Sequence, residues 1–149
     1  MFKVVNGGQL PTRGSKYSAC VDLYANADIT IGAGETVLIP LGVCIDLDDD
    51  SLKSNHYLQL MLRSSLSKEL IIANGVGVID FDYKDEIMIR VHRPIDYVTF
   101  HNEAYSNTFI TKGQRVAQIT LLEHKGYLFG IDTEDERNGG FGSTDIKEA

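Results

Sequence analysis

The sequence predicts an all-β protein, a β-sandwich or β-barrel, and three observations support this prediction. Short apolar or alternating runs are cut by Gly, Asn and Asp along most of the chain, a pattern typical of many short strands. Only one segment has the character of a helix. No internal repeat, low-complexity stretch or Pro/Ser-rich linker divides the 149 residues, so we expect one domain with a substantial core.

The predicted strands follow one another at short intervals, and Pro40 interrupts or bends the third. Their ranges are Phe2–Val5, Ala19–Ala25, Glu35–Ile45, His56–Leu62, Ile71–Asn74, Val76–Ile79, Glu86–Val91, Ile95–Phe100 and Arg115–Leu122. The single predicted helix spans Ser64–Leu70, about two turns, with Ser64 or Ser65 as its cap.

The last residues have neither a strand nor a helix pattern. Asp132–Glu136 is an acidic run, and Arg137 and then Gly139–Thr144 follow it, with three glycines around one aromatic residue. We therefore expect a β domain over residues 1–131 and a flexible C-terminal arm over residues 132–149. A glycine-rich arm can approach an anion closely with its backbone, although chain ends are often simply disordered.

Composition and charge exclude several classes of function. Twenty-one acidic against fourteen basic residues give a net charge of −7, which argues against a general attraction to nucleic acid or to anionic lipid. No apolar run approaches the roughly 18 residues that span a bilayer, and the first residues lack a secretory signal, so we expect a cytoplasmic protein. Cys20 and Cys44 have no CxxC partner and the four histidines are scattered, so a tightly bound transition metal is not expected.

Arg63 is the first candidate for binding an anion. It precedes Ser64 and Ser65 at the predicted junction of a strand and a helix. Such a junction presents amide donors to anions, but the same residues also suit an ordinary cap beside a surface arginine.

Two further polar residues lie in predicted strands. Asp22 stands in an apolar segment, where an unpaired carboxylate is costly, so this residue either forms a salt bridge or has a function. Gln118 follows the turn glycine Gly113, with Arg115 between them.

The segment from Asn74 to Tyr83 is the most informative part of the chain. Its Asn74–Gly75 step between apolar runs predicts a hairpin whose turn exposes backbone donors and acceptors. Alternation along the strand that follows places Asp80 and Asp82 on one face. Two neighbouring carboxylates suit a general base or a cation site, or they merely close the strand.

In this order, these segments resemble the five motifs of the trimeric dUTPase family, the dUTP pyrophosphatases. The most specific are Gly77–Tyr83, Gly113–Gln118 and Gly139–Thr144. The resemblance implies a distorted jelly-roll fold of the β-clip type, assembled as a homotrimer. In this family the first, second and fourth motifs of a site come from one subunit and the third motif comes from a second subunit. The C-terminal arm of the third subunit closes over the site.

The reaction that the resemblance implies is hydrolysis of dUTP to dUMP and pyrophosphate, by attack of water on the α-phosphorus. This reaction would limit uracil incorporation into DNA and supply dUMP for thymidylate synthesis. Asp80 matches the catalytic aspartate, which orients and deprotonates the water. Asp22 matches the acid that holds Mg²⁺, the implied cofactor, through water molecules.

The resemblance also implies the contacts of the substrate. Asn74 and the backbone of residues 75–79 would read the uracil edge, Tyr83 would pack beneath the deoxyribose, and Phe141 would stack on the uracil. Arg137 would bind the γ-phosphate. The full implied set of substrate-binding residues is Arg63, Ser64, Ser65, Asn74, Gly77, Val78, Ile79, Tyr83, Gln118, Arg137, Phe141, Gly142 and Ser143.

The sequence departs from the family pattern in two ways, and both resemble features of phage-encoded members. Three residues separate Arg137 from Phe141, one fewer than in the usual arm. The link between the third and fourth motifs is longer than usual. The insertion at residues 91–105 is either a decorated surface loop or a surface for a protein partner or for the trimer interface.

Two other functions remain open at this point. The first is a dCTP deaminase-like enzyme, against which the segments expected to face the base contain no glutamate. The second is a nucleotide-switched protein-binding module that uses the 91–105 insertion as its contact surface.

Overall fold

Short strands make up almost all of the regular structure in the computed structural model, which describes residues 1–47, 49–95 and 107–131. The strands are β1 (Phe2–Val4), β2 (Thr12–Arg13), β3 (Val21–Tyr24), β4 (Ile29–Ile31), β5 (Thr36–Pro40), β6 (Val43–Ile45), β7 (His56–Leu62), β8 (Ile71–Ile72), β9 (Gly77–Ile79), β10 (Met88–His92), β11 (Thr108–Ile110) and β12 (Arg115–Glu123). Helical structure in these ranges is limited to α1 (Asp50–Lys53) and the 3₁₀-helix η1 (Gly126–Phe129). The all-β prediction is confirmed.

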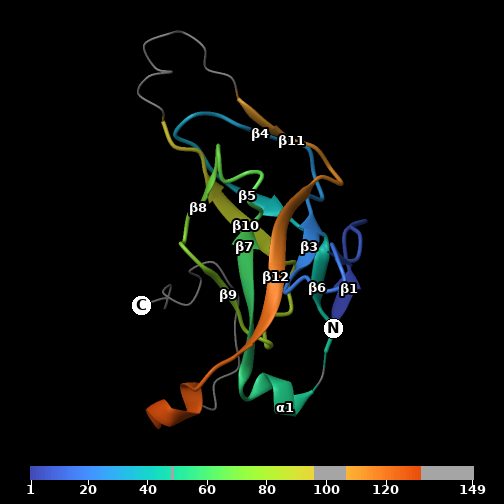
Figure 1. Ribbon diagram of the computed structural model, residues 1–149, viewed down its shortest axis with the longest axis vertical. Helices are drawn as coiled ribbons and strands as arrows, with labels where there is room; N and C mark the ends of the chain where they lie inside the picture. Colours follow the sequence, from blue (N-terminus) through green and yellow to red (C-terminus); the bar gives the residue numbers. More distant parts are fainter. Residues whose placement is uncertain (48, 96–106, 132–149) are drawn as a thin grey trace, which may run out of the picture.

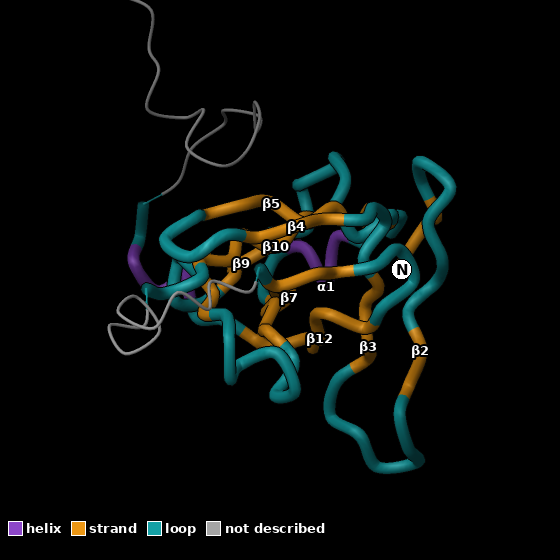
Figure 2. Tube along the Cα trace, turned by 90° about the horizontal axis from the view of Figure 1, so that it is seen from above, coloured by secondary structure: helices purple, strands orange, loops and turns teal. Residues whose placement is uncertain are grey.

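The strands form antiparallel sheets that pack in two layers. The largest sheet has the order β2-β3-β12-β7-β9, a second has the order β5-β10-β8, and the pairs β1-β6 and β4-β11 complete the fold. Figure 1 shows β12 running beside β7 through the centre of the molecule. Figure 2 shows β4, β5 and β10 in one layer and β3 and β12 in the other.

The core lies between these layers. Leu23, Leu58 and Ile119 of the large sheet and Ile39 and Ile89 of the second sheet are almost fully buried. Except at Leu23, which follows the buried Asp22, the neighbours of these residues along each strand are less buried, as expected where one face of a sheet is covered. No helix in the described ranges has the length and apolar character needed to cross a membrane.

The predicted helix at Ser64–Leu70 is wrong, because this segment forms consecutive turns. The amide of Leu66 donates to the Arg63 carbonyl, and only the amide of Leu70 makes a bond of helical span, to the Leu66 carbonyl. The Ser67 hydroxyl donates to the Ser64 carbonyl at 2.8 Å. Serine hydroxyls that bind nearby carbonyls compete with helix formation, which accounts for the difference.

The short helix instead lies at α1, where Asp49 accepts the amide of Ser51 as an N-cap. A hydrogen bond from the Ser51 hydroxyl lowers the pKa of Asp49. The two-residue and three-residue strands β2, β4 and β11 have no counterpart in the prediction. Of the predicted strand Ile95–Phe100, Ile95 lies outside any strand, and the remainder lies outside the described residues.

Pro40 ends β5 as predicted, and the chain bends at Gly42 before β6. Gly42 has a φ of +66°, a conformation that favours glycine. A Cβ at this position would lie 2.5 Å from the Gly8 Cα. The N-terminal loop and the bend between β5 and β6 therefore pack backbone against backbone.

The predicted hairpin at Asn74–Gly75 is also wrong, although the turn itself is present. Gly75 has a φ of +75°, and its amide donates to the Ile72 carbonyl at 3.2 Å. The flanking strands do not pair with each other, because β8 joins β10 while β9 joins β7. The turn thus connects the edges of two different sheets (Figure 1).

Candidate functional site

A cavity of about 160 Å³ opens between these two sheet edges. Five of the residues expected to bind substrate line it, and the sequence prediction had not included Leu60, Ile72, Met88, Ile89 and Arg90. The five predicted lining residues are Asn74, Gly77, Val78, Ile79 and Tyr83. The volume far exceeds the roughly 30 Å³ of one water molecule, so the cavity can admit part of an organic ligand.

The backbone of β9 lies along this cavity. β9 is an outermost strand of the five-stranded sheet and pairs with β7 through Gly77, Val78 and Ile79. An edge strand directs alternate N–H and C=O groups away from its only neighbour. These groups can hydrogen-bond the edge of a planar polar ring without any charged side chain.

Tyr83 contributes an aromatic surface to the cavity. The chain turns after β9, and the Tyr83 amide donates to the Asp80 carbonyl at 3.1 Å. The Tyr83 side chain packs in the core with 8% of the residue exposed. Its hydroxyl donates to the Glu86 carbonyl at 3.0 Å, so both ends of the residue are fixed.

At Gly77 the backbone of β9 lies close to Leu60 of β7. A Cβ at this residue would lie 2.9 Å from the Leu60 Cβ and 3.2 Å from the Leu60 carbonyl oxygen. We expect Gly77→Ala to lower the free energy of unfolding by about 1–3 kcal/mol, because the two strands must separate to admit the methyl group. Urea denaturation measures this change.

Gly14→Ala is the matched control, because the nearest atom to its added Cβ is the Ser18 Oγ at 3.6 Å, an ordinary contact. Equal stability of the two variants would contradict this account of Gly77.

Asp80 lies just outside the first cavity, in a neighbouring groove. This groove is lined by Tyr57, Val78, Asp80, His124, Lys125, Gly126, Leu128 and Phe129. Val78 lines both spaces, so a ligand in the cavity can extend toward Asp80. Asp80 and Asp82 are both exposed while Phe81 between them is buried, which agrees with their predicted placement on one face.

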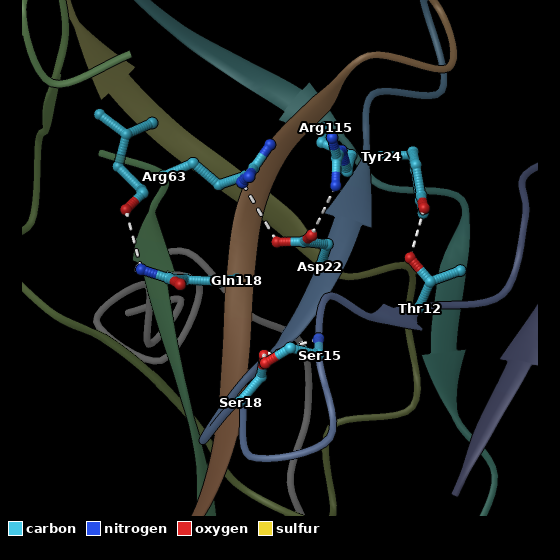
Figure 3. A network of polar contacts seen from close by, with 9 residues as sticks. Thr12, Ser15, Ser18, Asp22, Tyr24, Arg63, Arg115 and Gln118 are labelled. Carbon is cyan, nitrogen blue, oxygen red and sulfur yellow. Dashed lines mark hydrogen bonds and ion pairs between the residues drawn. The ribbon is translucent and has the colours of Figure 1, made fainter. Parts of the chain in front are cut away.

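A second polar centre surrounds Asp22 on β3 (Figure 3). The Arg63 Nε lies 3.1 Å from Asp22 Oδ1, and an Arg115 terminal nitrogen lies 3.3 Å from Asp22 Oδ2. The Asp22 side chain is 12% exposed. The first alternative for Asp22, a salt bridge, is therefore confirmed, and the two guanidinium groups exceed the single carboxylate by one positive charge.

A bulge in β12 brings Arg115 to this centre. Arg115 is opposite Tyr24 and Gln118 is opposite Asp22, with a register shift between Arg115 and Ala117. Residues three apart on a regular strand point to opposite faces, and one extra residue places them on the same face. Sequence reasoning missed Arg115 as a partner of Asp22, because no residue pattern indicated the bulge.

The remaining predicted phosphate contacts surround the same centre. The Gln118 side-chain amide donates to the Leu62 carbonyl at 3.5 Å, and Ser64 and Ser65 are exposed on the turn that follows Arg63. Figure 3 shows Arg63, Arg115, Asp22 and Gln118 together across β3 and β12. An anion of a phosphate-like size can meet guanidinium, amide and hydroxyl groups here.

Asp22 also fits an auxiliary role toward Mg²⁺ better than a primary one. In the part of the chain that the structure describes, no three His, Cys, Asp or Glu residues gather to hold a metal, and both Asp22 oxygens already face arginines. Mg²⁺ usually keeps several waters and binds one or two carboxylates together with substrate phosphates. A carboxylate that contacts water on the ion suits this coordination.

The two centres are far apart within one chain. Asp22 lies at the level of Met61 in the sheet, whereas Asp80 lies at the level of Tyr57. Four residues along the strand give about 13 Å, and three strand spacings across the sheet give about 14 Å. The backbone positions of Asp22 and Asp80 are therefore roughly 20 Å apart, too far for both side chains to reach one phosphate.

Arg137, Phe141, Gly142 and Ser143 lie outside the described residues, as does most of the 91–105 insertion. Their predicted roles stay predictions.

The chain matches the dUTPase family over residues 6–145. A deoxyuridine 5'-triphosphate nucleotidohydrolase from Rickettsia akari is 36% identical over 147 residues, which cover 93% of this chain and 90% of the relative. The dUTPase from Streptococcus mutans matches with a TM-score of 0.67 at 26% identity and covers 83% of this chain and 95% of that one. A variant dUTPase from phage phi11 of S. aureus, whose structure shows a structural Mg(II) ion, matches with a TM-score of 0.69 at 17% identity over 95% of this chain and 97% of that one. The structural matches confirm the predicted fold.

Proposed function

Because this chain belongs to the dUTPase family, we propose that it hydrolyses dUTP to dUMP and pyrophosphate by attack of water on the α-phosphorus. The observation that supports this best is the cavity between β8 and β9, which is lined by five of the residues expected to bind substrate. Through this reaction the protein would limit uracil incorporation into DNA and supply dUMP for thymidylate synthesis.

Asp80 is the general base in this proposal. Its carboxylate is exposed in the groove beside the cavity, where it can accept the proton of a water molecule as that water attacks phosphorus. The oxygen of the water forms the new P–O bond, and pyrophosphate leaves with the electrons of the bond that breaks. Asp80 holds the proton until solvent takes it.

Arg63, Ser64, Ser65 and Gln118 bind the phosphate chain. The positive charge near Asp22 explains how a protein of net charge −7 attracts a polyanion, because local charges dominate at contact distance. Asp22 would contact the waters of Mg²⁺, which when bound neutralises charge that develops on the phosphates. Arg137 would add a further cation at the γ-phosphate.

The cavity selects the base and the sugar. Uracil presents two carbonyl oxygens and one N–H along its edge, which the β9 backbone and Asn74 can match. Cytosine places an amino group where uracil has a carbonyl, so a donor would face a donor in a confined space, which is costly. Tyr83 would pack under the deoxyribose and exclude a 2′-hydroxyl, and Phe141 would cover the base with Gly142 and Ser143 beside it.

A homotrimer completes the site. The roughly 20 Å between Asp22 and Asp80 leaves each chain with two half-sites, and a second copy can bring its own Asp80 to the phosphates bound near Arg63. The arm of a further copy would close over the base. The β domain at 1–131 and the arm at 132–149 are the units of this proposal.

Pyrophosphate release from dUTP, dCTP, dTTP and UTP, each with Mg²⁺, tests the proposed reaction. We expect release from dUTP, and at least about 100-fold lower kcat/KM with each of the others. Cytosine mismatches the hydrogen-bonding groups of the pocket, whereas the thymine methyl group and the 2′-hydroxyl of UTP would overlap its walls. Omission of Mg²⁺ with added chelator should lower the rate with dUTP.

Ammonia release from dCTP, measured in the same samples, is the control for the deaminase alternative. A deaminase needs a proton-shuttling group at the base, and the only ionisable side chains along the cavity are Tyr83 and Arg90, among the residues that the structure describes. Ammonia without pyrophosphate would contradict the proposal. Binding of dUTP without any product would favour a nucleotide-switched binding module instead.

A further inference from the structure

The Tyr83 hydroxyl is attached to the backbone three residues further along the chain. This hydroxyl donates to the Glu86 carbonyl at 3.0 Å, and Lys84 and Asp85 between the two residues are exposed. After Glu86, the Ile87 amide donates to the Val43 carbonyl at 2.8 Å. The Tyr83 ring is therefore held by the core around it and, at its hydroxyl, by the Glu86 peptide.

The carboxylate of Glu86 attaches this peptide to two distant turns. Its Oε1 accepts the amide of Gly42 at 2.7 Å, and its Oε2 accepts the side-chain amide of Asn6 at 2.7 Å. Asn6 is held in turn, because its carbonyl accepts the Asn26 side-chain amide at 3.0 Å. Both oxygens of a half-buried carboxylate are thus used for backbone or fixed side-chain donors.

Of the two partners of Glu86, Gly42 lies in a closely packed bend, and Asn6 is an exposed residue whose backbone carbonyl is hydrogen-bonded to Asn26. Gly42 packs against Gly8 with no room for a Cβ, and both Gly42 and Asn6 have positive φ. Hydrogen bonds to an ionised acceptor are stronger than those between neutral groups. A strong bond to a rigid partner defines a position, whereas the same bond to a flexible surface group does not.

We propose that Glu86 is a positioning residue for Tyr83: by holding the carbonyl that receives the Tyr83 hydroxyl, it fixes the aromatic floor of the cavity and sharpens selection of deoxyribose over ribose. This inference rests on the proposed function, because it takes the nucleotide sugar as the group above Tyr83. Glu86 itself does not line the cavity.

The ratio of kcat/KM for dUTP to that for UTP tests this role. In Glu86→Ala, which removes both carboxylate hydrogen bonds, we expect this ratio to fall about tenfold, with kcat for dUTP within about twofold of wild type. Glu86→Gln should keep most of the selectivity, because its amide oxygen can accept from Gly42 and the Asn6 amide can rotate to accept from its nitrogen.

Tyr83→Phe removes the same attachment from the other side. It should lower the ratio by a similar factor, and the double variant with Glu86→Ala should lower it no further, since residues that act through one contact are not additive. If Glu86→Ala does not fold, two other variants supply the same comparison. The first is the double variant Glu86→Gln with Asn6→Ala, and the second is Tyr83→Phe alone.

Glu35→Ala is the matched control, because Glu35 Oε2 also accepts a glycine amide, that of Gly32 at 2.7 Å, in a turn that does not line the cavity. It should leave the ratio unchanged. An equal loss with both nucleotides in Glu86→Ala, or the same change of ratio in Glu35→Ala, would overturn the positioning role. A selective wild type whose ratio is unchanged in Glu86→Ala overturns this inference alone, whereas a wild type inactive on dUTP overturns the proposed function with it.

Discussion

Asp80→Asn should abolish pyrophosphate release from dUTP almost completely, with kcat lowered by about 10²- to 10⁴-fold, the usual contribution of a general base. Asparagine has nearly the shape of aspartate but cannot take a proton from water at neutral pH. Binding of dUTP should be equal or tighter, because the substitution removes a negative charge near the triphosphate. A pyrophosphate assay and titration calorimetry measure the two effects separately.

Asp82→Asn is the control for this substitution. Asp82 is also exposed and two residues away, but it lines neither the cavity nor the groove beside it, so its kcat should stay within about twofold of wild type. Hydrolysis retained in Asp80→Asn and lost in Asp82→Asn would transfer the role of base to Asp82. Loss of dUTP binding in Asp80→Asn would instead indicate a role in substrate binding.

The sequence predicted the strands and the candidate residues of the cavity because both depend on local patterns. Apolar alternation identified β7, β9 and β12, since residues two apart share a face. The Asn74–Gly75 step correctly indicated a tight turn. Its hairpin interpretation failed because the partners of β8 and β9 are distant in the sequence, and no local signal shows that a turn joins two sheets.

The divergence of β8 and β9 into two sheets also accounts for the cavity. If β8 and β9 had paired with each other, the backbone groups between them would be used in a ladder. Because they diverge into separate sheets, the space between them can receive a ligand. Ile72, Met88 and Arg90 line it from the second sheet, and sequence reasoning could not select them without the strand order.

The environment of Asp22 was predictable only in outline. A carboxylate in an apolar segment indicated a partner, because burial of an unpaired charge is unfavourable. Arg63 was a candidate by its place before the serines. Arg115 reaches Asp22 because of the bulge near Val116. The Val116 carbonyl also accepts the Arg63 amide at 3.1 Å. The positions of two arginines that are distant in the sequence therefore depend on one irregularity of β12.

The separation of Asp80 from Arg63 leads to the second large expected effect, restoration of activity in a mixture of two inactive variants. Asp80→Asn lacks the base, and Arg63→Ala lacks the cation beside Asp22, so neither should hydrolyse dUTP well alone. If each site combines Arg63 of one protomer with Asp80 of its partner, co-refolding at equal amounts should give about a quarter of wild-type activity by random assembly. A site contained in one protomer would give none.

The complementary control is wild type co-refolded with the variant that carries both Asp80→Asn and Arg63→Ala. Its activity also differs between a shared site and a site within one protomer. A shared site needs two intact protomers and should again give about a quarter of wild-type activity, whereas a site within one protomer should give about half. Light scattering on each mixture shows whether assembly has occurred. An inactive mixture of the single variants, together with about half of wild-type activity in the control, would contradict the shared site. Asp80 and Arg63 would then have to meet within one chain. The register of the five-stranded sheet opposes such a meeting.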